Sequence, residues 1–246
     1  MVLLEKFNNM KKLFLLLFSA AIVVTSNAQI GDLLKKATGK TSNGKSNLST
    51  DEIASGLKEA LNKGVSEGTT KLSAVDGFFK DAAIKILMPP DAVKVEKTLR
   101  NVGLGQQVDD AILTMNRAAE DAAKSASPIF VDAIKQMSIE DAWGILKGGD
   151  SAATRYLRTK TTPALTAAFK PVIDQSLEKT GATKYWNTVF SSYNKFSLNK
   201  VNPDLSDYVT EKALSGIFYQ IALEETQIRK DPVARTSDLL KKVFGS

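Results

Sequence analysis

The spacing of apolar residues is the feature that most constrains this chain. From Ser49 onward, apolar residues recur with the period of an α-helix, and the first stripe consists of Ile53, Leu57, Leu61 and Val65. No stretch alternates apolar and polar residues over the length of a strand between turn signals. The sequence therefore predicts an all-α fold, a compact multi-helix bundle.

Capping residues predict where two of the helices begin. Ser49 and Glu52 match a capping box, in which the serine hydroxyl bonds first-turn amides and the carboxylate reaches back. Ser138 to Asp141 predict another helix start, and that helix should end at Gly148. The residues that it is expected to bury are Ile139, Ala142, Trp143 and Leu146.

Prolines, glycines and further N-cap residues place the remaining helices. They are expected to begin at Pro89-Pro90, near Gln106, at Ser127-Pro128, at Asp150, at Thr162-Pro163, at Asn202-Pro203 and after Pro232. Gly103 should stop the helix that begins at Pro89-Pro90. Pro171 should bend or split the helix that begins at Thr162-Pro163, because an internal proline removes one backbone hydrogen bond.

The first 28 residues have the three parts of a secretory signal peptide. Lys11 and Lys12 supply the positive region, residues 13–24 are apolar or small, and Ser26 and Ala28 stand where a signal peptidase reads small residues. The apolar run is shorter than the roughly 20 residues that span a bilayer, so an uncleaved membrane anchor is the less favoured alternative. We expect a periplasmic or secreted protein that meets the membrane only during export.

The expected cleavage lies between Ala28 and Gln29. A lipid-anchored bacterial precursor has a cysteine as its first mature residue, and this chain contains no cysteine. We therefore expect a product that is not a lipoprotein. Whether Met1 or Met10 is the true start stays open, because the basic pair of the signal follows Met10 directly.

The absence of cysteine and histidine excludes several kinds of site. Serine–histidine–acid triads, cysteine nucleophiles, ordinary zinc sites and the histidine-containing di-iron sites of helix bundles all need one of these residues. Carboxylate acid–base chemistry, an oxygen-only metal site and a serine–lysine pair remain. We expect no metal and no cofactor.

Residues 29–48 read as a linker, between a signal peptide over 1–28 and a single helical domain over 49–246. Residues 39–46 match the string of a phosphate-binding loop, but no apolar strand precedes them, so we expect no nucleotide. The formal net charge of +6 is spread along the chain and forms no stripe, so we expect no nucleic acid either.

Glu225 is a candidate functional residue because it falls on an apolar helix face. Leu214, Ile217, Phe218, Ile221 and Ile228 define that face at 100° per residue. A carboxylate there is either paired or neutral with a raised pKa, and Arg229 lies one turn further on. One interpretation is a catalytic or ligand-binding acid. The favoured interpretation is a structural ion pair that bridges two helices.

Two further polar groups are candidates for a polar cleft. Asn116, Arg117 and Glu120 share the helix predicted over 106–124, where the favoured alternative is exposed pairing along the helix. Asp141, Thr154 and Arg155 flank a glycine turn between two helix starts, which can hold an anion. Plain capping is the favoured alternative for this second group.

Two other patterns each have two interpretations. Asn202, Asp204 and Ser206 have part of the spacing of a calcium loop, but a helix N-cap accounts for them better. The aromatic residues of 185–196 suit either an apolar ligand pocket or, as favoured here, the core.

Several short strings run through the chain in order. They are residues 115–120, 138–143 with 149–155, 207–209, and 224–232 with 239–245. In these strings the chain, from about Ser49 to Gly245, resembles the bacterial family known as domain of unknown function 4197. The resemblance implies a helical exported protein. It implies no activity, so it assigns no catalytic role to any residue.

The leading hypothesis is an exported helical binding or structural module of the cell envelope, without catalysis, whose partner is an envelope protein or a small ligand. One alternative is an enzyme that uses Glu225 or Glu120 as general acid or base on cell-wall glycan. Another alternative is a carrier of a small apolar ligand that uses the aromatic residues of 185–196.

Overall fold

The computed structural model describes residues 49–179, 181, 183, 186, 194, 204–235 and 237–244. Over these residues the chain is helical and contains no strand, so the predicted all-α fold is confirmed. The chain divides after Lys45, and every described helix belongs to the unit Ser46–Ser246. The expected signal peptide, the linker and the loop-like string at 39–46 lie outside the described residues.

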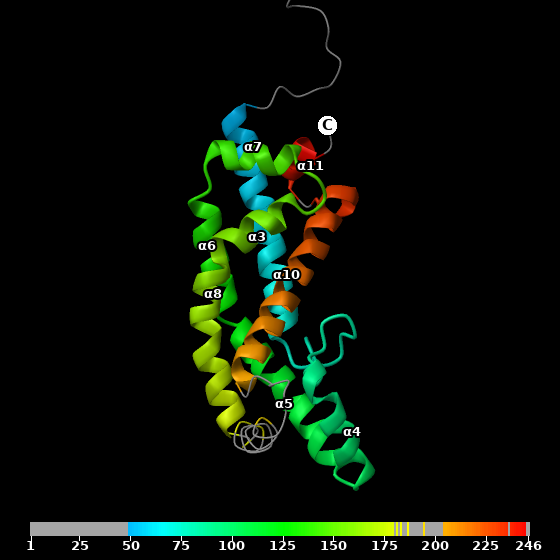
Figure 1. The fold of residues 1–246 in the computed structure, drawn as a ribbon. Coiled ribbons are helices and arrows are strands. Elements are labelled where there is room, and N and C mark those ends of the chain that lie inside the picture. Colours follow the sequence, from blue (N-terminus) through cyan, green and yellow to red (C-terminus); the bar gives the residue numbers. More distant parts are fainter. Residues whose placement is uncertain are drawn as a thin grey trace, which may run out of the picture. The chain divides into compact units, whose positions relative to one another are not determined.

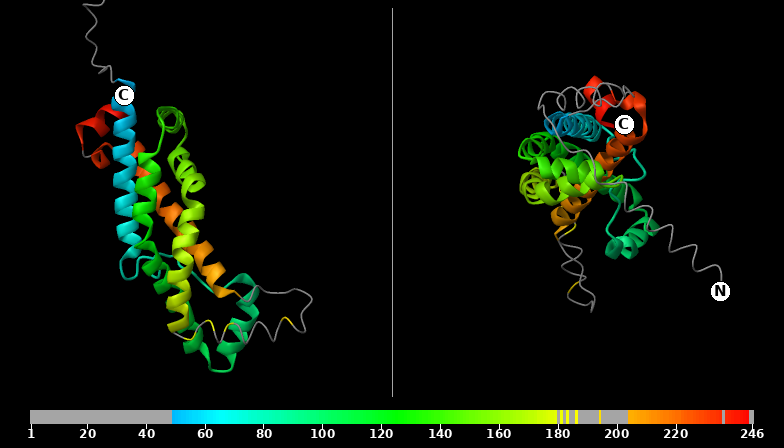
Figure 2. Two further views of the ribbon diagram at one scale, coloured as in Figure 1. Left: turned by 90° about the vertical axis from the view of Figure 1, so that its left-hand side faces the viewer. Right: turned by 90° about the horizontal axis from the view of Figure 1, so that it is seen from above.

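The helices form a bundle in which segments distant in sequence lie side by side (Figures 1 and 2). Their order is α3 (Thr50–Ser73), the 3-10 turn η1 (Pro90–Ala92), α4 (Val93–Asn101), α5 (Gly105–Ala123), α6 (Ala126–Lys135), α7 (Ile139–Lys147), α8 (Ala152–Lys179), α10 (Leu205–Lys230), the 3-10 turn η2 (Pro232–Ala234) and α11 (Asp238–Phe244). The main contacts join α10 to α8 and α3, and α5 to α8.

The core lies between these long helices. Phe130 of α6 and Phe218 of α10 meet edge to face, with ring centroids 5.8 Å apart and an interplanar angle of 87°. Phe78, Phe169 and both of these rings are fully buried. Because each buried aromatic side chain contributes a large apolar area, this cluster supplies much of the burial that a chain without disulfides depends on.

Helix ends form where the sequence indicated them. The Ser49 hydroxyl accepts a bond from the Glu52 amide at 3.2 Å, and the Glu52 carboxylate accepts one from the Ser49 amide at 2.8 Å. Asp204 caps α10 by accepting bonds from the amides of Ser206 and Asp207. These two caps, and the stop of α4 before Gly103 with its φ of 84°, confirm the local predictions.

Helix α8 corrects a prediction. Separate helices were expected after Asp150 and after Thr162, with a further break at Pro171, but one helix contains both Pro163 and Pro171. Its buried residues recur every four positions, at Leu157, Thr161, Leu165, Phe169, Ile173 and Leu177. Helix α8 packs against α5, α6 and α10, so tertiary burial outweighs the roughly 3 kcal/mol that an internal proline costs.

Helix α7 corrects another prediction. It begins at Ile139 after a capping box of Ser138 and Asp141, as expected, and Ala142 is buried as expected. Ile139 is exposed, however, and Trp143 and Leu146 are only partly buried, whereas Ile145 is buried. A helix of this length has apolar residues on more than one side, and only its docking on α3 and α8 decides which side faces the core.

Candidate functional site

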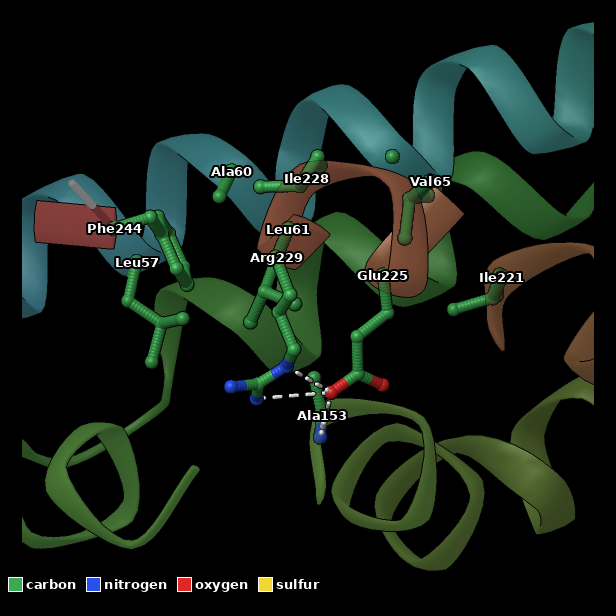
Figure 3. A pocket seen from close by; sticks show the side chains of 11 residues that line it. Leu57, Ala60, Leu61, Val65, Ala153, Ile221, Glu225, Ile228, Arg229 and Phe244 are labelled. Atoms are coloured by element: carbon green, nitrogen blue, oxygen red, sulfur yellow. Dashed lines mark hydrogen bonds and ion pairs between the residues drawn. The ribbon is translucent and has the colours of Figure 1, made fainter. Parts of the chain in front are cut away.

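Glu225 of α10 is buried and satisfied by several donors. Its Oε1 accepts bonds from the Ala153 amide at 3.0 Å and from Arg229 Nε at 3.0 Å. Its Oε2 accepts bonds from the Thr154 amide at 2.9 Å and from the Thr154 hydroxyl at 2.7 Å. Figure 3 shows the carboxylate pointing at the first turn of α8 beside the Arg229 guanidinium. Glu225 therefore caps α8 from another helix, where the helix dipole favours a negative charge.

Arg229 extends this arrangement to a third helix. Its Nη2 lies 2.9 Å from Glu225 Oε1 and donates to the Ile145 carbonyl at 2.9 Å. The two side chains are only 4% and 12% exposed. The ion pair thus ties α10 to the start of α8 and the end of α7, which is the structural role that the sequence favoured for it.

A small cavity lies beside this ion pair (Figure 3). Its volume is about 20 Å³, and its other walls are apolar residues of α3, α10 and α11, among them Leu61, Ile221 and Phe244. A cavity of this size holds about one water molecule. It offers no room for an organic substrate next to Glu225.

Asn116 of α5 serves the backbone of a neighbouring segment. Its Oδ1 accepts a bond from the Ile86 amide at 2.9 Å, and its Nδ2 donates to the Ile86 carbonyl at 2.8 Å. Nδ2 also donates to the Ile112 carbonyl at 2.7 Å. Asn116 is fully buried, so these bonds remove what would otherwise be a substantial desolvation cost.

Glu120, one turn along α5, holds the start of the same segment. Its Oε1 accepts bonds from the Phe78 and Phe79 amides at 3.1 and 3.2 Å. Its Oε2 accepts a bond from Arg117 Nη1 at 2.6 Å, while Arg117 Nη2 donates to Asp76 Oδ1 at 2.7 Å. Hydrogen bonds from Lys80 and then Arg117 lower the pKa of Asp76, and the two carboxylates raise the pKa of Arg117.

Asn116, Arg117 and Glu120 together form what we name the α5 clamp, which fixes the segment between α3 and η1. Asp76 within this segment has a φ of 72°, which is unusual for a residue other than glycine. Ion pairs with Lys80 and Arg117 stabilise this conformation. Phe78 is buried as a result, and its ring lies so close to Gly216 of α10 that a Cβ there would stand 2.5 Å from Phe78 Cε1. The clamp is therefore structural.

The predicted anion site between α7 and α8 is occupied by the protein itself. The first-turn amides of α8 bond Glu225, as described above. Asp141 instead completes the capping box of α7, and the Ser138 amide is the main cause of its lowered pKa. Burial raises the pKa of Tyr156, whose hydroxyl lies 3.4 Å from Asp141. Arg155 is exposed and donates to Ser151 at 3.1 Å.

The predicted site residues thus fall into separate groups. Thr154, Glu225 and Arg229 form one group, and the α5 clamp forms another. Asp141 and Arg155 belong to neither. Within the described residues, no hydrogen bond or ion pair joins the two groups. Most of the aromatic stretch 185–196 lies outside the described residues, and Trp186, which is described, is buried in the core.

A surface groove of about 420 Å³ lies between the segment 83–87 and α10. Its lining residues are Ala83, Ile84, Lys85, Ile86, Leu87, Tyr208, Lys212, Ser215, Gly216 and Tyr219. Ile84, Ile86 and Gly216 are buried, whereas Leu87 is 56% exposed and Tyr219 is 42% exposed. The groove therefore combines an apolar floor with accessible polar and aromatic walls, as ligand and peptide sites commonly do.

The two lysines of this groove lie over aromatic rings. Lys85 Nζ is 3.9 Å from the ring centroid of Phe79, and Lys212 Nζ is 5.6 Å from that of Tyr208. Neither lysine forms an ion pair within the part of the chain that the structure describes. Burial, followed by the charge of Glu211, raises the pKa of Tyr208, whose hydroxyl donates to the Leu87 carbonyl at 3.0 Å. Two lysines without an ion pair thus line the groove, and the carboxylates of Asp109 and Glu211 lie near enough to interact with Lys85 and Tyr208 through their charge.

The sequence did not predict this groove. One signal was present, because Tyr208, Lys212, Ser215 and Tyr219 share one face of a helix by their spacing. The other wall carries no such signal, because contacts between distant segments bring 83–87 beside α10, among them the bonds of the α5 clamp and the bond from Tyr208 to the Leu87 carbonyl. Among the described residues, no group of acidic, histidine or cysteine side chains is arranged to hold a metal ion. None of the described helices is long and apolar enough to cross a bilayer.

A family model described as a protein of unknown function (DUF4197) matches residues 47–245. The chain belongs to this family. The resemblance seen in the short strings is thereby confirmed, and the DUF4197 match covers α3 to α11 with both the Glu225 ion pair and the groove. Neither the curated proteins nor the solved structures compared with the chain contain a match.

Proposed function

We propose that this chain is an exported binding module of the cell envelope, and that the groove between residues 83–87 and α10 is its binding site. The observation that supports this most is the difference in how polar groups are used. Glu225, Arg229 and the α5 clamp all bond to protein groups, whereas Lys85 and Lys212 in the groove form no ion pair with a described carboxylate. Lysines without a bonded carboxylate beside an accessible apolar floor suit recognition of another molecule.

The bonds of the two buried carboxylates argue against the alternative of a carboxylate-dependent glycan hydrolase. A general acid or base must come within hydrogen-bond reach of a substrate. The Glu225 oxygens are occupied by α8 and Arg229, and the side chain is 4% exposed. Glu120 is similarly occupied by two amides and Arg117 and is 5% exposed at its side chain. The apolar-carrier alternative depends on residues that lie mostly outside the described part.

The export part of the proposal depends on residues 11–28 of the sequence. It is tested by fractionating the native host and sequencing the N-terminus of the protein. We expect the periplasmic or secreted fraction to hold a chain that begins at Gln29. Ala28→Glu should block the cut and leave a longer chain with the membranes. A chain found only in the cytoplasm and still containing residues 11–28 would contradict export.

The binding part is tested by site-specific photocrosslinking in the host. A photoreactive phenylalanine analogue replaces Tyr219 on the wall of the groove, and the matched control places it at Ser66, an exposed position on α3. We expect an adduct from position 219 that is lost on adding Lys212→Glu, and none from position 66. Equal adducts from both positions, or an adduct unaffected by Lys212→Glu, would speak against the groove.

A further inference from the structure

We propose that the occupant of the groove is an extended, acidic peptide segment of a partner protein, which adds to the main chain of residues 85–87 as a neighbouring strand does. This inference rests on the proposed function.

The backbone at Ile86 is extended. A single side-chain amide, that of Asn116, bonds both its N–H and its C=O. Both groups of one residue point to the same side only where the backbone is extended, as at a strand edge. Met88 and Pro89 each precede a proline, which also restricts them to extended conformations. Asn116 thus takes the place of an adjacent strand on one side of this segment.

The other side of the segment carries the backbone groups of Lys85 and Leu87. In extended backbone, the groups of Lys85 and Leu87 point away from Asn116. The Leu87 carbonyl bonds Tyr208, which lines the groove, and the Lys85 amide bonds the Asp81 carbonyl at 2.8 Å. The Leu87 N–H and the Lys85 C=O have no hydrogen-bond partner among the described residues. This donor and acceptor have the spacing that one residue of a parallel strand bonds.

The side chains of the groove also favour an acidic peptide. Lys85 stands on one wall of the groove and Lys212 on the other. A peptide lying between them places its side chains alternately toward the floor and toward the walls. Apolar side chains then meet Ile84 and Gly216, and carboxylates meet the lysines. An acidic, alternating segment therefore fits both the apolar floor and the charge of the walls.

The test uses the protein purified from its host, labelled for amide NMR. The probe is a capped pentapeptide of alternating valine and glutamate. We expect it to shift the groove amides and to slow hydrogen exchange of the Leu87 amide at least tenfold. A peptide with lysine in place of glutamate, and one with an N-methyl group on its central residue, should not bind. The N-methyl probe tests main-chain pairing without altering the protein.

Lys212→Glu should weaken the pentapeptide about tenfold or more. The matched control is Lys242→Glu, the same charge change on α11, which packs on Gly56 of α3 away from the groove. Both lysines are exposed, so both variants should keep the wild-type amide spectrum elsewhere. Equal weakening by the two variants would mean that only net charge is sensed, and would overturn the inference.

A second titration, with sodium dodecanoate in place of the pentapeptide, distinguishes failure of this inference from failure of the proposed function. If dodecanoate shifts the groove amides while the pentapeptide does not, the groove binds apolar anions, so the peptide inference fails and the binding module stands. If the Leu87 amide is already protected without any probe, the chain itself fills the site and the inference fails. If neither probe shifts a groove amide at millimolar concentration, both proposals fail.

Discussion

The two ends of α10 use charge in opposite ways. Near its C-terminal end, Glu225 and Arg229 are buried, and each of their bonds ends on the protein. Near its N-terminal end, Lys212 is exposed over the groove and forms no ion pair with a described carboxylate. The first arrangement carries a high desolvation cost and therefore requires complete pairing. The second carries little cost, so it can leave charge available for another molecule.

Mutations that test function should therefore be made in the groove and not at Glu225. A carboxylate on an apolar helix face, such as Glu225, stands out most in the sequence. In the structure, however, Glu225 and its partner Arg229 connect three helices. Lysine and tyrosine on a polar face are a weak signal, because most such faces are merely solvated. What distinguishes this polar face is the segment 83–87, which the α5 clamp holds opposite it.

The largest effect is expected from Glu225→Gln. The change removes the negative charge and turns an acceptor into a donor that faces the amides of Ala153 and Thr154, while Arg229 loses its partner. Breaking a buried ion pair in this way costs about 3–5 kcal/mol. Urea unfolding followed by circular dichroism measures the loss. Glu140→Gln, at an exposed position, is the control and should change stability by less than about 0.5 kcal/mol. An unchanged unfolding midpoint for Glu225→Gln would contradict the stabilising role of the buried ion pair.

The next effect is expected from Asn116→Leu, which links the two regions. The Ile86 amide and carbonyl lose their partner in a buried setting, at a cost of about 1–3 kcal/mol for each unsatisfied group. The segment 83–87 should loosen, so pentapeptide binding should weaken together with stability. Glu225→Gln, examined under conditions where it is still folded, should leave that binding unchanged. If Asn116→Leu spares binding, the clamp does not form the groove.

A smaller effect is expected from Gly216→Ala. Its added methyl would lie 2.5 Å from Phe78 Cε1, so the buried ring must move, and overpacking of this kind costs about 1–3 kcal/mol. Gly144→Ala in α7 is the matched control, because nothing lies within 4 Å of the added atom. That variant should gain up to about 1 kcal/mol, since alanine favours helix over glycine. Thermal unfolding compares the two, and a stabilised Gly216→Ala would show that Phe78 is loosely held.

The smallest effect is expected from acid acting on Asp76. Lys80 and Arg117 lower its pKa in the folded chain relative to the unfolded chain. The stabilisation is therefore complete above the unfolded value of about 4, and it is lost as pH falls through the lower folded value. Asp76→Asn should be less stable than wild type at neutral pH, and the difference should shrink as the pH drops below about 4. A difference that stays constant with pH would contradict this assignment.

Much of the local structure could be predicted from the sequence because its causes are local. The capping residues Ser49, Glu52 and Asp204 act within one helical turn, and Gly103 stops α4 through its own backbone. The pairing of Glu225 with Arg229 follows from a spacing of four residues. Each of these depends on neighbours that the chain itself places side by side.

Prediction failed where distant segments decide the outcome. Pro163 and Pro171 disrupt a helix locally, but burial of one stripe against three other helices keeps α8 continuous. Ile139 has the composition of a core residue, but the docking of α7 leaves it exposed. Neither result is contained in the residues near the position concerned.

The sequence by itself determined that this chain is helical, where several helices begin and end, and that its chemistry excludes cysteine and histidine sites. Only the tertiary structure decided that Glu225 caps a helix begun more than 70 residues earlier, and that the clamp residues hold a segment instead of lining a cleft. It also decided that Lys85 and Lys212 face one groove. The physical reason is that periodicity and capping act within a turn, whereas burial and charge pairing depend on which helices meet.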